Sequence, residues 1–238
     1  SSARAEQTVC LIPGLNGATE FFMEEVPNEM KLRGFNFVSL EVVSNGTLQD
    51  HVKILVKLIS AKLQLNPEFH CSLVLAHSMG GLIIRSAMKQ PVHHPFYDYF
   101  LLSNVVDHIV TVGTPHYGTP VFEQLHFSPA SAQMTPLAMQ NTLSNPQSPY
   151  YAPSMRKKYS YVGTYMSSVF GSSIPIEQWG FQFLLGMQLV SDGIVPLESQ
   201  RFGVEIETLN VRHTWLNDPS PAERPEVLDY FEYLANLF

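Results

Sequence analysis

The stretch LVLAHSMGGLIIR, residues 73–85, places a serine among small residues where an apolar run ends. A serine hydroxyl is a poor nucleophile at neutral pH. It needs a histidine to take its proton, a carboxylate to orient that histidine, and N–H donors for the oxyanion. On a parallel sheet, such a serine occupies a tight strand-to-helix turn with small residues two positions before and after it. Ala76 and Gly80 flank Ser78 in this way, which indicates nucleophilic chemistry. The alternative, a helix N-cap, accounts for the serine but not for its small neighbours.

The acid and the histidine must follow Ser78 in that order for a nucleophile on this kind of turn. Asp192, in LVSDGIVPLESQ, follows an apolar run and precedes a glycine, which predicts a loop at a strand's carboxyl end, where open parallel sheets bind ligands. An ordinary Asp-Gly turn is the alternative. His213 is the only histidine after Asp192, so the order selects it over a reading as a surface-loop histidine. Glu198, in an expected helical turn, and Asp218, after the histidine, are poorer candidates for the acid.

Two backbone N–H groups are needed to hold the oxyanion. One belongs to Met79, the residue after the nucleophile, and the other to Leu15, in the loop LIPGLNG that follows the first expected strand. Gly14 lets this loop turn freely. Four residues near the expected site are predicted to line a substrate pocket: His77, His116, Tyr117 and Val195. The two histidines in this set precede the acid, so they are expected to line the pocket or bond to backbone. His93 and His94 lie in a Pro-flanked loop and are expected to be solvated.

Apolar strands that alternate with helices must position these residues. Short segments rich in apolar residues predict strands at 7–14, 34–43, 70–78, 105–115 and 204–211, and the first of them is continuously apolar. Helical periodicity predicts helices at 47–66, 79–90 and 220–238, the first begun by Thr47 with Asp50 and the last by Ser220, Pro221 and Glu223. Apolar strands in alternation with helices indicate an α/β fold, a mostly parallel sheet with helices on both faces.

Residues 118–190 do not follow this pattern, being rich in Pro, Ser, Gln and Asn with weak periodicity. Long irregular insertions in a compact domain are usually functional loops or lids. Within this range, 158–165 is expected to be a strand that rejoins the sheet. The apolar segment 169–187 fits a lid or pocket wall and equally a piece of core. We expect one domain over 1–238, with a lid or cap insertion at about 118–186.

Composition excludes several classes of protein. The chain has 238 residues, of which 45% are apolar and 15% charged, and this allows a large core. A formal charge of −7 without a basic cluster argues against nucleic acid as a partner. The longest apolar runs fall far short of the roughly 20 residues that span a bilayer, and no leader peptide is visible. Cys10 and Cys71 lie in strand-like runs, where two buried thiols are favoured over a disulfide, and no zinc spacing occurs. The Lys-poor composition hints at export to the periplasm or outside the cell.

The motifs around the predicted site, in their order along the chain, resemble those of the lipases and esterases of the α/β-hydrolase family, most of all bacterial triacylglycerol lipases. LIPGLNG resembles their oxyanion loop, LAHSMGGLIIR their nucleophile elbow, SDGIVPLESQRFG their acid loop and VRHTWLND their histidine loop. Little within about 120–185 resembles the family. The resemblance implies an α/β-hydrolase fold and a catalytic triad of Ser78, Asp192 and His213. The family often has His where Pro13 stands, and the residue expected to ligate a structural calcium after His213 is missing, so no metal is predicted.

The sequence therefore predicts a serine ester hydrolase that forms an acyl-enzyme and needs no cofactor. Its expected partner is a lipid or other apolar ester, with transient contact to a lipid interface. A phospholipase, a thioesterase or a lipid-anchor deacylase would use the same triad. A non-catalytic binding protein of hydrolase fold is the alternative from another class, and three triad residues in the required order argue against it.

Overall fold

The structure is a computed structural model, and it describes residues 7–14, 21–125, 128–143, 145–148, 151, 153–166, 190–216 and 218–238. At its centre lies a sheet of six strands in the order β2-β1-β3-β4-β5-β6, and every neighbouring pair is parallel. The strands are β1 (Thr8–Ile12), β2 (Asn36–Ser39), β3 (Cys71–His77), β4 (Val106–Val112), β5 (Tyr159–Tyr165) and β6 (Val204–Asn210). The expected parallel sheet is confirmed, including the strand predicted to rejoin it at 158–165.

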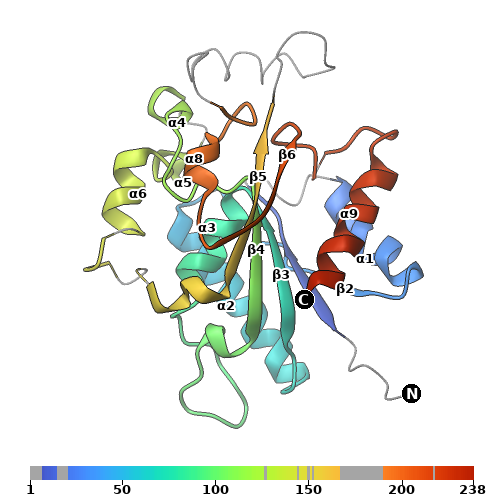
Figure 1. The fold of residues 1–238 in the computed structure, drawn as a ribbon. Helices are drawn as coiled ribbons and strands as arrows, with labels where there is room; N and C mark the ends of the chain where they lie inside the picture. The colour runs from blue at the N-terminus through green and yellow to red at the C-terminus, as the bar shows by residue number, and fades with distance from the viewer. Residues whose placement is uncertain are drawn as a thin grey trace.

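Helices cover both faces of this sheet (Figure 1). α2 (Leu48–Leu65) and α3 (Met79–Ala87) pack on one face and share an apolar core with β1 and β3. α1 (Phe21–Leu32) and α9 (Arg224–Leu237) pack on the other and build a second core there. The sheet thus buries side chains on both faces, which explains why its central strands are apolar throughout.

Sequence signals predict the start of α2 correctly, but they place the start of α9 too early and do not indicate α1. Thr47 and Asp50 form the predicted capping box of α2: the Thr47 hydroxyl accepts from the Asp50 N–H, and the Asp50 carboxylate accepts from the Thr47 N–H. α9 begins at Arg224, not next to Ser220, because residues 221–223 form a turn. In that turn the Glu223 carboxylate still accepts the Ser220 N–H, as the Ser-x-x-Glu spacing implies. Sequence analysis missed α1, whose interior contains Pro27.

Cys10 and Cys71 form a disulfide, with their Cα atoms 5.7 Å apart. The interpretation of two free buried thiols is therefore wrong. Both residues are fully buried in the core between the sheet and α2. The strand-like runs around each cysteine carried no information on which strands are neighbours, whereas β1 and β3 pair directly in the sheet.

The chain between β4 and β6 carries short helices: α4 (Val121–Gln124), α5 (Pro129–Ala132), α6 (Pro136–Thr142), the 3-10 helix η3 (Pro153–Lys158) and α8 (Leu197–Gln200). β5 lies within the range predicted as an insertion and belongs to the sheet. Residues 167–189, which include the apolar segment predicted as a lid or pocket wall, lie outside the described residues, so the lid stays a prediction. Among the helices that the structure describes, none is long and apolar enough to cross a bilayer.

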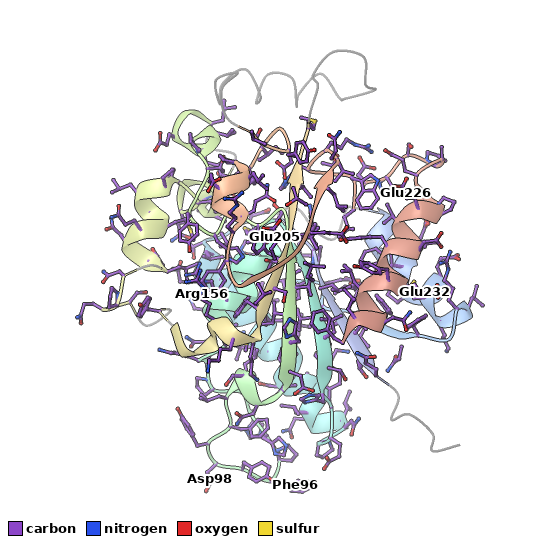
Figure 2. The ribbon with its side chains drawn as sticks, in the orientation of Figure 1. Phe96, Asp98, Arg156, Glu205, Glu226 and Glu232 are labelled. Atoms are coloured by element: carbon purple, nitrogen blue, oxygen red, sulfur yellow. A yellow bond between two sulfur atoms is a disulfide. The ribbon has the colours of Figure 1, made fainter. Side chains whose placement is uncertain are left out.

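A loop between α3 and the 3-10 helix η2 (Leu102–Asn104) lies at the end of the molecule opposite the carboxyl ends of the strands. Figure 2 shows Phe96 and Asp98 at its tip. His94 of this loop is buried, its ring packs 4.5 Å from that of Phe100, and its Nε2 donates to the Pro67 carbonyl at 3.2 Å. The prediction that His94 is solvated is wrong: the loop folds back on its own aromatic side chains and encloses the ring.

Candidate active site

The chain turns sharply at Ser78, between the end of β3 and the start of α3. Ser78 has φ 51° and ψ −127°, and among the described residues it alone combines a side chain with a positive φ. Its N–H donates to the Val112 carbonyl at 2.9 Å, and its carbonyl accepts the Thr114 hydroxyl at 2.9 Å. A Cβ atom at Gly80 would lie 2.4 Å from the Ile12 carbonyl oxygen. Strained backbone of this kind clusters at functional sites, and the crowding explains why a glycine follows.

The structure brings Ser78, His213 and Asp192 together. In sequence, Ser78 lies 135 positions before His213, and Asp192 lies 21 positions before it. The Nε2 atom of His213 lies 2.8 Å from Ser78 Oγ, and its Nδ1 lies 2.8 Å from Asp192 Oδ2. Asp192 is fully buried and His213 is 7% exposed. Because an ionised carboxylate only accepts hydrogen bonds, Nδ1 carries the proton and Nε2 is left to accept the Ser78 hydroxyl. This is the arrangement that proton transfer from the serine requires.

Asp192 is held by more donors than sequence analysis foresaw. Its Oδ1 accepts the N–H groups of Ile194 at 3.1 Å and Val195 at 2.8 Å, in a turn where Gly193 has φ 99°. Its Oδ2 accepts the Thr164 hydroxyl at 2.7 Å in addition to His213 Nδ1. Gln200 lies beside both Thr164 and Asp192. Thr164 and Gln200 are polar residues in runs without a recognisable motif, so no sequence signal pointed to them.

His77 is buried and contacts the backbone of His213. Its Nε2 donates to the His213 carbonyl at 2.8 Å, and the two ring centroids are 5.0 Å apart. Burial lowers the pKa of His77 to about 3, and the nearby His213 adds to this shift. His77 is therefore neutral at physiological pH and supports the histidine loop through a bond to backbone, one of the two roles expected for it.

The other predicted pocket residues differ in exposure. His116 is fully buried, where burial and then the Arg85 guanidinium hold its pKa well below the usual value. Tyr117 is 42% exposed, and Val195 is buried with its N–H on Asp192. A cavity of about 440 Å³ in the described part lies between β6 and α9 and is lined by none of these residues. Their role in a substrate pocket remains a prediction.

Of the two predicted oxyanion donors, Met79 lies among the described residues and Leu15 does not. Met79 is the first residue of α3, so its N–H has no partner within the helix. A Cβ atom at Gly14 would lie 2.9 Å from Ser78 Cβ and 3.4 Å from its Oγ, so the loop after β1 passes directly against the serine. Leu15 lies outside the described residues and remains a prediction. In the described ranges, no three His, Cys, Asp or Glu side chains gather in a way that could hold a metal ion.

The chain is similar to one protein-family model and to several solved structures. A family model, the PGAP1-like alpha/beta domain, matches residues 35–151. The mature form of a Bacillus licheniformis lipase matches with a TM-score of 0.70 and 18% identity, covering 99% of this chain and 94% of that one. A metagenomic carboxyl esterase gives 0.70 and 16%, over 98% and 76% of the two chains. A Staphylococcus hyicus lipase gives 0.64 and 12%, over 99% and 97%. No curated protein matches by sequence.

The strand order, the turn at Ser78 and these matches define the class of protein: the chain has the α/β-hydrolase fold. Within that class it resembles bacterial lipases and esterases, and the likeness extends over nearly the whole chain. The fold-class prediction and the predicted resemblance are confirmed.

Proposed function

We propose that the protein is a serine ester hydrolase in which Ser78, His213 and Asp192 form the catalytic triad. One observation carries the proposal: two hydrogen bonds of 2.8 Å run from Ser78 Oγ through the His213 ring to a fully buried carboxylate. A buried charge is costly unless it is paired and hydrogen-bonded, and a helix N-cap serine would need neither the histidine nor the acid. The positive φ of Ser78 supports the same interpretation, since a nucleophilic serine on a strand-to-helix turn has a strained backbone.

The proposed reaction has two halves. Ser78 Oγ attacks the ester carbonyl while its proton passes to His213 Nε2, and the N–H groups of Met79 and Leu15 stabilise the oxyanion. The C–O bond to the alcohol then breaks, and the alcohol leaves with the proton from His213. Water next attacks the acyl-enzyme, giving its proton to Nε2, and the acid is released as Ser78 recovers its proton. Asp192 keeps the His213 ring in the tautomer that accepts this proton.

The proposed substrates are apolar or lipid-like carboxylic esters. Among the similar solved structures are two lipases and a carboxyl esterase. The apolar segment 169–187 lies at the carboxyl-terminal end of the insertion predicted at about 118–186, and in this proposal it supplies the wall against which an acyl chain packs. We also propose that segment 169–187 contacts a lipid surface, which the comparison of rates above and below the micelle threshold tests.

The test combines a fluorophosphonate probe with p-nitrophenyl esters of graded chain length. Wild type should be labelled and active, while Ser78→Ala should be unlabelled with kcat lower by about three orders of magnitude or more. Ser86→Ala is the matched control, because Ser86 is buried in α3, the helix that begins directly after Ser78, and its hydroxyl has no hydrogen-bond partner among the described residues. An unlabelled and inactive wild type, or full activity in Ser78→Ala, would refute the proposal.

The same assay identifies the ester class. Rates that rise with chain length, and rise further above the micelle threshold, support a lipase that acts at an interface. Phospholipid vesicles, an acyl thioester and an acylated inositol lipid serve as parallel substrates, and faster turnover of one of them would assign the activity to that class. Equal rates for short and long chains would contradict an apolar acyl pocket.

A further inference from the structure

A buried hydroxyl shares the carboxylate oxygen that His213 uses. Thr164 Oγ1 lies 2.7 Å from Asp192 Oδ2, and His213 Nδ1 lies 2.8 Å from the same atom. Thr164 is 2% exposed at the carboxyl end of β5, and Asp192 is fully buried. With its Oδ1 on the N–H groups of Ile194 and Val195, the carboxylate is held at both oxygens. An aspartate χ2 torsion is otherwise broad, so these contacts set the plane of the carboxylate.

Gln200 holds the backbone of Thr164 in place. Its Oε1 accepts the Thr164 N–H at 2.8 Å, and its Nε2 donates to the Thr164 carbonyl at 2.9 Å and to the Val195 carbonyl at 3.1 Å. The amide thus fixes the end of β5 and the acid turn to each other. The Thr164 hydroxyl lies 3.1 Å from Gln200 Oε1 and 2.7 Å from Asp192 Oδ2. Since a hydroxyl donates one hydrogen, and charged acceptors form the shorter and stronger bonds, this hydrogen goes to the carboxylate.

We propose that Thr164, held by Gln200, is a positioning residue that keeps Oδ2 of Asp192 aimed at His213. The inference rests on the proposed function, because it gives Thr164 a role only if His213 acts as the base. Neither residue touches the substrate in this scheme. Without the hydroxyl, the carboxylate retains its backbone donors on Oδ1, but on Oδ2 it keeps only His213 Nδ1 and a long contact of 3.5 Å with Gln200 Nε2. The plane of the carboxylate is then held less firmly, and the ring that it orients loses alignment with Ser78.

The test is a set of three single variants assayed on the best p-nitrophenyl ester. Thr164→Val removes the hydroxyl and keeps a β-branched side chain, which suits a strand. A hydrogen bond to a charged group corresponds to roughly a 10- to 100-fold effect, so kcat should fall by about that factor, with KM within about twofold. Thr164→Ser restores the donor and should keep kcat within about threefold of wild type. Thr111→Val is the matched control, because Thr111 is equally buried in β4 and its hydroxyl contacts His116 and the Ser160 carbonyl.

A double-mutant cycle separates positioning from a general loss of packing. In an Asp192→Ala background, Thr164→Val should change the residual rate less than about threefold, because the group through which it acts is gone. A wild-type kcat in Thr164→Val, an equal loss in Thr111→Val, or the same fold-loss in both backgrounds overturns the inference. If Thr164→Val does not fold, Thr164→Cys, with its weak S–H donor, takes its place in the same comparisons. An inactive wild type would instead refute the proposed function.

Discussion

Gly113 lies directly after β4 and borders the hydrogen bond between Asp192 and His213. It has φ 59°, and a Cβ atom there would lie 3.2 Å from Asp192 Oδ2 and 3.3 Å from His213 Nδ1. In Gly113→Ala, the left-handed backbone should cost about 1–2 kcal/mol of stability. Contacts this short also force the carboxylate or the ring to shift by a few tenths of an ångström. Because a misplacement of about 1 Å costs roughly 100-fold in rate, we expect kcat to fall by about tenfold.

Gly34→Ala is the matched control for this prediction. Gly34 has φ 86°, and a Cβ atom there would meet nothing within 4 Å, so the variant carries the same kind of backbone strain without the contact. Both variants should unfold at a temperature about 2–8 °C below wild type. Only Gly113→Ala should lose kcat, measured with p-nitrophenyl esters well below either melting temperature. Equal activity in the two variants would refute the reasoning that the spacing of Asp192 and His213 limits the rate.

Three further predictions concern the sheet and the turn. Ala76→Val should impair folding or activity much more than Ala76→Gly, because the Ala76 side chain is 1% exposed beneath the turn; equal yields and kcat values would contradict a crowded elbow. Replacing Cys10 and Cys71 by alanine opens a 61-residue loop and should lower the free energy of urea unfolding by about 2–4 kcal/mol, and an unchanged midpoint would refute this. His77 has a pKa of about 3 in the native state, so stability should fall as the pH drops from about 6.5 towards 3, because the unfolded chain binds a proton that the native state does not. His77→Gln keeps a donor for the His213 carbonyl and should flatten the slope of unfolding free energy by up to about 1.4 kcal/mol per pH unit; an unaltered slope would show that this histidine is not the source.

Much of the fold could be predicted because its strands and long helices have strong local patterns. α2 carries a Thr47–Asp50 capping box and repeats apolar residues at the helical period, and it buries Leu48, Val52, Leu55, Ile59 and Leu63. The predictions fail for α1 and for the start of α9, where contacts with distant residues override the local sequence pattern. α1 runs through Pro27, which argues against a helix when the sequence is considered alone. At the start of α9, Glu223 binds Arg212 as well as the Ser220 N–H, and a long-range ion pair of this kind cannot be seen in a capping pattern.

The same division applies to the site. The residue types, the small neighbours of Ser78 and the order of acid and histidine sufficed to select Asp192 and His213, which the structure places in hydrogen-bond contact. The partners of that carboxylate could not be selected in this way. Thr164 and Gln200 occupy ordinary positions in a strand and a short helix, and only the packing of β5 against the acid turn brings them to Asp192.

The sequence by itself therefore determined the class of fold and the groups that could do chemistry, because periodicity and motif order are properties of the linear chain. The tertiary structure decided what surrounds those groups. It paired Cys10 with Cys71 across neighbouring strands, buried His77 behind His213, and placed a threonine hydroxyl on the carboxylate. These features depend on the distances between segments that are far apart in the chain, and the pattern within any one segment carries no information about such distances.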